Sequence, residues 1–220
     1  MLDCQYCKGS RLSPTNLATL GTLGLMLPAL RFLHLSGTPS SATDTTGPDG
    51  VQRLLAGLGA GALPAVTYLC FGGMRVGDTG ASALAAALDR GALPRLDNLV
   101  LSSATIGDAG LVALAPALRQ RPALVRLGLE RNPLGDEGLA ALVAPPPPAG
   151  APPTTGVLTK LKVLYLSHTQ ITDAGCATLA SALDSGALPS LVNLPLRGIP
   201  ARDAAIEAVW AKMVAKYRAQ

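Results

Sequence analysis

Few side chains in this sequence of 220 residues are of the types that do chemistry in enzymes. Its two histidines, His34 and His168, are four units of a repeating pattern apart and cannot share one site. Cys4 and Cys7 form a single C-x-x-C pair with no second pair and no histidine nearby, whereas a zinc site needs about four ligands. No phosphate-cradling loop or nucleophilic serine turn is present. We therefore predict no catalytic residue, no cofactor and no metal site.

One acidic residue recurs along the chain, and each time it opens an Ala- and Leu-rich stretch. A carboxylate at this place can accept from the free N–H groups of a helix's first turn, and its charge suits the positive end of the helix dipole. We therefore interpret these aspartates as helix caps and not as paired acids. A glycine two residues later leaves room for a neighbouring coil. The aspartates are Asp49, Asp78, Asp108, Asp136 and Asp173, with a degenerate copy at Asp203, and the glycines are Gly80, Gly110, Gly138 and Gly175.

An L-x-x-L-x-L string precedes each aspartate. Because alternate residues of a strand share one face, its second and third apolar positions predict a short buried strand. Strand and helix alternate with a period near 29 residues, which is typical of a solenoid. We predict an α/β horseshoe of about six repeats, with a parallel sheet on the concave face and helices on the convex face. The strings begin at Leu30, Val66, Leu96, Leu124, Leu161 and Leu191.

The phrases at residues 106–118 and 171–183, I-G-D-A-G-L-V-A-L-A-P-A-L and I-T-D-A-G-C-A-T-L-A-S-A-L, resemble the ribonuclease-inhibitor-type leucine-rich repeats. This subfamily also supplies the repeats of NOD-like receptors and of the Ran GTPase-activating protein. The family commonly has Asn or Cys at the ninth position of the strand segment, where it ties adjacent turns together. Here only Asn132 matches, so we expect less regular turns. The other residues at this position are Thr38, Met74, Ala104, Thr169 and Ile199.

The repeat pattern also divides the chain. Residues 1–12 are predicted to be a disordered tail, and residues 13–202 the leucine-rich-repeat solenoid. Ser13 and Pro14 are placed to begin an opening helix. Insertions fall near residues 38–48 and near 145–156, the second a proline run that favours a linker over a docking motif. Residues 203–220 carry a longer apolar stripe, including Trp210, which we interpret as a cap over the last hydrophobic flank; a partner-binding helix is the alternative.

Composition narrows the class of partner. A net charge of +4 and a pI near 9.0 would be compatible with nucleic-acid binding. The basic residues are mostly scattered, however, and no aromatic side chains accompany them as a stacking platform for bases. Four dispersed cysteines make no disulfide framework and favour a reducing, cytoplasmic compartment. The uncharged segment 12–30 is interrupted by polar residues, Gly and Pro, so we predict no membrane anchor. We expect a monomer that binds protein.

The outward positions of the predicted strands form columns on the concave face. Aromatic and arginine side chains on such a face are the commonest anchors of protein interfaces. We therefore predict a protein-interaction module or scaffold. The alternatives are a GTPase-activating regulator, for which Glu130 with Arg131 is the one candidate cluster, and a repeat fragment of a NOD-like receptor. The predicted partner-binding residues are Phe32, Tyr68, Asn98, Arg126, Arg131, Tyr165 and His168.

Overall fold

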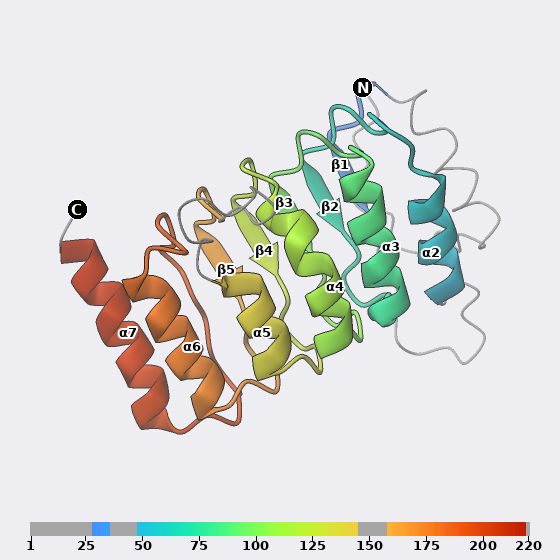
Figure 1. Ribbon diagram of the computed structural model, residues 1–220. Coiled ribbons are helices and arrows are strands. Elements are labelled where there is room, and N and C mark those ends of the chain that lie inside the picture. Colours follow the sequence, from blue (N-terminus) through green and yellow to red (C-terminus); the bar gives the residue numbers. More distant parts are fainter. Residues whose placement is uncertain (1–27, 36–47, 145–157, 219–220) are drawn as a thin grey trace, which may run out of the picture.

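The computed structural model describes residues 28–35, 48–144 and 158–218. They form an elongated stack of two layers, with a sheet on one side and helices on the other (Figure 1). The predicted tail at 1–12, the opening helix that begins at Ser13, the insertion at 145–156 and all but the last residue of that at 38–48 lie outside the described residues.

The sheet is parallel, and its strands follow one another in chain order. They are β1 (Phe32–His34), β2 (Tyr68–Cys70), β3 (Asn98–Val100), β4 (Arg126–Gly128) and β5 (Val163–Tyr165). The helices are α2 (Pro48–Gly57), α3 (Gly77–Asp89), α4 (Asp108–Arg119), α5 (Asp136–Val143), α6 (Asp173–Asp184) and α7 (Asp203–Arg218). Neighbouring helices pack side by side. The predicted α/β solenoid is confirmed.

Leucine fills the space between the layers. The middle residues of three successive strands, Leu99, Leu127 and Leu164, are register partners and are fully buried. Burying a leucine side chain contributes about 1.5–3 kcal/mol, so this middle position is one of the main anchors of each strand. Helices, about 10 Å wide, need more room than strands spaced about 4.8 Å apart, which places the sheet on the inner side of any curvature.

The sixth predicted strand is the exception to the repeat. Its string at residues 191–196 forms no regular strand and pairs with β5 as an isolated bridge between Val163 and Asn193, although Leu164 still donates to the carbonyl of Asn193 and Leu166 to that of Pro195. Leu194 and Leu196 are still buried, as the pattern requires. Pro195 explains the difference, since proline has no N–H to donate to the neighbouring strand.

The recurrent aspartates link neighbouring repeats, and our interpretation of them as caps of their own helices is wrong. The Asp78 carboxylate accepts from the N–H of Gly107 at 2.7 Å, in the turn before the next helix. Asp108 accepts from the N–H groups of Gly135 at 2.7 Å and Gly138 at 2.9 Å. Each of these aspartates begins or lies in the first turn of a helix, so its charge still suits the helix dipole. The carboxylate is thus shared between two coils.

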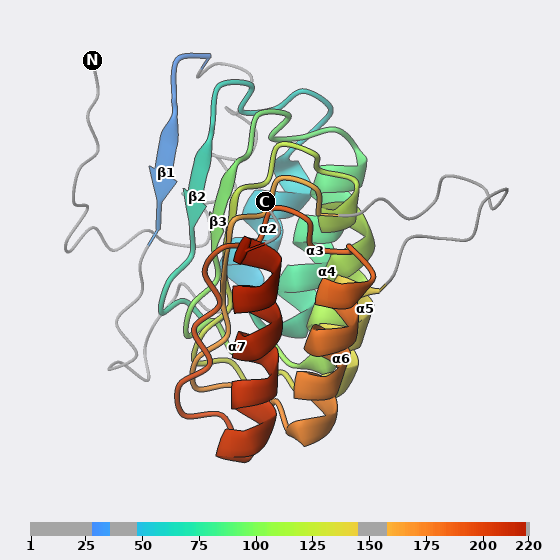
Figure 2. The same cartoon turned by 90° about the vertical axis from the view of Figure 1, so that its left-hand side faces the viewer.

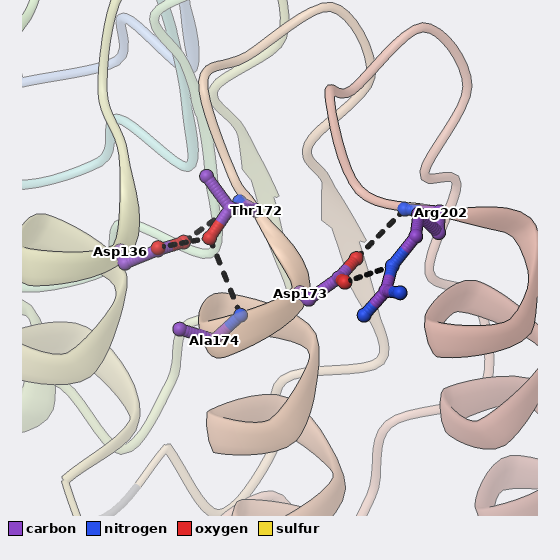
Figure 3. A network of polar contacts seen from close by, with 5 residues as sticks. All are labelled: Asp136, Thr172, Asp173, Ala174 and Arg202. Atoms are coloured by element: carbon purple, nitrogen blue, oxygen red, sulfur yellow. Dashed lines mark hydrogen bonds and ion pairs between the residues drawn. The ribbon is translucent and has the colours of Figure 1, made fainter.

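The aspartates that link successive repeats form a ladder of contacts along the stack. In its last two links, side chains donate hydrogen bonds in addition to backbone N–H groups (Figure 3). Asp136 accepts from the N–H and the hydroxyl of Thr172, at 2.8 and 2.5 Å. Thr172 in turn caps α6 by accepting from the N–H of Ala174. Asp173 accepts from the N–H of Arg202 at 2.7 Å and pairs with its guanidinium at 2.5 Å. The hydrogen bonds from Arg202 lower the pKa of Asp173. The ladder therefore continues to the start of α7.

In three repeats the glycine two residues after the aspartate makes room for the neighbouring coil, as the pattern predicted, and the group it admits is the aspartate of the preceding repeat; Gly80 instead faces Val76. A Cβ at Gly110 would lie 2.4 Å from Asp78 Oδ1 and 3.0 Å from Asp78 Cα. A Cβ at Gly175 would lie 2.3 Å from Asp136 Oδ1. The D-x-G spacing therefore allows the aspartate of one coil to pack against the glycine of the next.

Basic residues make the matching contacts at the other ends of the helices. The Arg90 guanidinium donates to the carbonyls of Leu55 and Leu58 at the end of α2. Arg121 donates to the carbonyl of Leu88 near the end of α3. Positive charge at helix carboxyl ends offsets the dipole and satisfies carbonyls that the helix leaves unpaired.

The turns after the strands are more regular than we expected from the missing asparagines. Asn132 is buried, accepts from the N–H groups of Ala104 and Ile106, and donates to the carbonyl of Leu101. Backbone hydrogen bonds connect the successive turns whether or not asparagine is present: turn residues donate to the next turn at 2.7–2.9 Å in four successive pairs. The donors are Gly73, Ser103, Arg131 and His168, all in the left-handed conformation.

The last helix covers the end of the stack with part of its apolar stripe. Val209 and Met213 are buried against α6 and the final coil. Trp210 and Val214 stay 49% and 50% exposed. Trp210, which we interpreted as a cap residue, therefore has only about half of its surface covered, and Val209 and Met213 are the fully buried part of the stripe.

We predict that Gly110→Ala lowers the free energy of unfolding by about 1–3 kcal/mol, because its Cβ would displace the Asp78 carboxylate and crowd the backbone behind it. This loss outweighs the gain of about 1 kcal/mol that alanine brings to a helix. Urea unfolding followed by circular dichroism measures it. Gly59→Ala is the control, because its Cβ meets nothing within 4 Å. Equal unfolding midpoints for the two variants would contradict the shared-carboxylate account.

Candidate functional site

The candidate site is the outward face of the sheet, where each strand presents its first and third residues. Register places the first residues of all five strands in one column and the third residues in a second. The first column is Phe32, Tyr68, Asn98, Arg126 and Val163, and the second is His34, Cys70, Val100, Gly128 and Tyr165. Both columns are those predicted from the sequence.

Four of the seven predicted binding residues are direct neighbours in the first column. Phe32 is 58% exposed, Arg126 is exposed, and Tyr68 and Asn98 are half-buried. Tyr165 lies in the second column at 37% exposure. The sheet thus presents an aromatic end at β1 and β2 and a polar, cationic stretch at β3 and β4.

The aromatic end is a cluster of three rings. The ring of Tyr68 lies 6.1 Å from that of Phe32 and 6.5 Å from that of His34, tilted and edge-on respectively. Such contacts stabilise the rings beyond simple burial and present large side chains at small entropic cost. His34 was not among the predicted binding residues, although its place beside Tyr68 follows from the same register.

Burial, with a smaller effect of the nearby Cys70 thiol, raises the pKa of the Tyr68 phenol. The thiol of Cys70 is itself buried and accepts from the N–H of Gly72 at 3.4 Å. At neutral pH the phenol therefore keeps its proton and can donate a hydrogen bond to a partner.

A second feature of the face, missed from the sequence, lies over Gly128. The missing side chain there leaves space into which Glu130 and Ser102 lean: a Cβ would lie 3.3 Å from Glu130 Oε2 and 3.4 Å from Ser102 Oγ. Both oxygens are buried, and neither has a hydrogen-bond partner within the described part of the chain. Groups of this kind favour a partner that supplies a donor. The glycine in an otherwise apolar column was the available sign.

Arg131 and His168 form a separate pair in the turns beyond β4 and β5. Both have a left-handed backbone, with φ of 57° and 58°. The Arg131 N–H donates to the carbonyl of Ser167, beside His168 in the next turn, so the two occupy equivalent places. The His168 ring lies against Gly198, where a Cβ would come within 2.4 Å of Nδ1. The predicted residues therefore fall into a strand group and a turn group.

The remaining chemistry-bearing residues form no site in the described ranges. His34 and His168 lie on and after the first and last strands of the sheet. Across residues 28–35, 48–144 and 158–218, no three His, Cys, Asp or Glu side chains gather as a metal site would need. Cys4 and Cys7 lie outside those residues. In the same part of the chain, none of the helices has the length and apolarity to cross a bilayer.

Comparison with known proteins agrees with this architecture. The leucine-rich-repeat family model matches residues 96–115, 123–143 and 157–180. No curated protein sequence matches this chain significantly. Among solved structures, the leiomodin-1 actin-binding site 2 is similar at 11% identity and a TM-score of 0.50, over 93% of this chain and 90% of that one. The tropomodulin C-terminal domain of Caenorhabditis elegans is similar at 13% identity and the same score, over 93% of both chains. At these identities the similarity shows the fold alone.

We predict that Tyr68 ionises above the ordinary phenol value of 10.0. Since the neutral form is favoured in the fold, this contribution to stability is complete below the unfolded pKa and is lost as the pH rises through the folded pKa. Ultraviolet titration of tyrosinate in the wild type minus Tyr68→Phe measures the value, with circular dichroism to confirm folding at each pH. Tyr165→Phe controls for the loss of one ring. A Tyr68 midpoint at or below 10 would contradict the prediction.

Proposed function

We propose that this chain, whose fold is a leucine-rich-repeat solenoid, is an interaction module that binds a partner protein across the outward face of its sheet. The observation that carries the proposal is the register of the strands. It brings Phe32, Tyr68, Asn98 and Arg126 together as one column, although they are spread over 95 residues of sequence.

The chemistry of the column suits a peptide-like or protein surface. The Phe32, Tyr68 and His34 rings offer a rigid apolar anchor, and buried aromatic contacts carry much of the energy at protein interfaces. Asn98 and Arg126 add an amide and a guanidinium, which can pair with a carboxylate or with backbone groups. Ser102 and Glu130 lie two residues beyond the ends of β3 and β4, and their unpaired buried oxygens can accept hydrogen bonds from a partner.

We further propose that the repeats are of the ribonuclease-inhibitor type, since each described repeat contains a helix and the period is near 29 residues. A cytoplasmic location would suit the free thiols of Cys70 and Cys176. The leiomodin-1 structure is described as an actin-binding site, but a shared fold does not carry that partner over to this chain. The GTPase-activating alternative rests on Glu130 and Arg131 alone, and a GTP-hydrolysis assay with small GTPases tests it.

We predict that Tyr68→Ala combined with Arg126→Ala reduces recovery of the partner by at least about tenfold, because two central anchors are removed. Affinity capture with the immobilised full chain, quantified by mass spectrometry, measures the recovery.

The matched control removes one arginine and one apolar side chain from the helical side. Arg53→Ala with Val112→Ala alters exposed residues of α2 and α4 and is expected to leave recovery unchanged. Equal recovery by the wild type and the sheet variant would count against this site. Equal loss in both variants would assign binding to some other surface.

A further inference from the structure

The outer face of α7 is an apolar surface that the solenoid leaves uncovered. α7 stands at the end of the stack, and no other described helix or strand lies outside it (Figure 2). Val209 and Met213 face inward, whereas Trp210 and Val214, one helical turn apart, are half exposed. Trp210 and Val214 lie next to each other on the helix surface, and burying them in an interface would stabilise a complex.

Charge is arranged along the face with opposite signs at its two ends. Glu207 lies one turn before Trp210, and Arg218 lies one turn after Val214; both are exposed. The two lysines of α7 point elsewhere: Lys212 pairs with Asp184 at 2.7 Å, and Lys216 donates to the carbonyl of Leu188. Glu207 and Arg218 are thus the charges that flank the apolar pair.

This order, acid–Trp–Val–base, is complementary to itself when reversed. An antiparallel copy of α7 with its two-fold axis between the apolar residues sets Glu207 beside Arg218 of the second copy, and Trp210 beside Val214 of the second copy. A closed two-fold contact needs this property, because the same patch must serve both subunits. The antiparallel arrangement also opposes the two helix dipoles favourably.

We propose that the chain forms a two-fold homodimer through antiparallel packing of α7. The partner that fits the face is a second copy of the chain, because both its apolar centre and its terminal charges find their complements there. This proposal departs from the monomer expected from the sequence. It is independent of the sheet face, which remains open in each subunit.

Sedimentation equilibrium of the full chain tests the proposal. The wild type is expected to be a dimer, and Glu207→Arg or Arg218→Glu alone is expected to raise the dissociation constant at least about tenfold, since each change converts two attractive pairs into repulsive ones. Mixing these two variants is expected to restore dimers, because each subunit then meets charges opposite to its own. Trp210→Ala is expected to dissociate the dimer without loss of helical circular dichroism.

Arg53→Glu, a charge reversal on α2 at the other end of the stack, is the control and is expected to leave the dimer intact. Restored association in the mixture cannot come from damaged folding of the single variants. The proposal is overturned if the wild type is monomeric at millimolar concentration. This holds also if the α7 face of that monomer binds a different protein. So does a mixture that associates no better than its components.

Discussion

The whole arrangement depends on a carboxylate that two neighbouring coils share. Asp108 belongs to one repeat, yet it binds the N–H groups of Gly135 and Gly138 in the next. Basic residues such as Arg90 repeat the scheme at the opposite helix ends. Since these bonds form only when coils are in register, they add directional contacts to the non-directional burial of the leucine core.

That register also fixes the candidate site. Each strand offers only two outward positions, and its middle leucine is committed to the core. A surface such as the one from Phe32 to Arg126 is therefore built one residue per repeat, from positions about thirty residues apart. Its side chains can vary without altering the scaffold, which is how one fold carries different recognition surfaces.

Periodic features of the molecule are the ones that the sequence predicts. The columns could be predicted because the leucine spacing sets strand position and side-chain direction together. The role of Asp108 could not, because a carboxylate near a helix start can bind N–H groups of its own helix or of a neighbouring coil, and only the packed structure shows that it binds those of Gly135 and Gly138. Pro195 can be read from the sequence, but it interrupts a strand only if the N–H of that residue would have donated to the neighbouring strand, which depends on the register. For Trp210 and Val209, adjacent in one stripe, only the packing of α7 decides which is covered.

Pro195 also affects how the end of the stack is held. Because Pro195 has no N–H to donate, the final coil makes one backbone hydrogen bond fewer to β5 than a regular strand would, and it keeps those from Leu164 to Asn193 and from His168 to Arg197. The Asp173–Arg202 bonds and Lys216 then hold this coil from either side. Opening of the solenoid should begin at this margin, with backbone amides near Leu164 exchanging with deuterated solvent sooner than those of Leu99 in the middle.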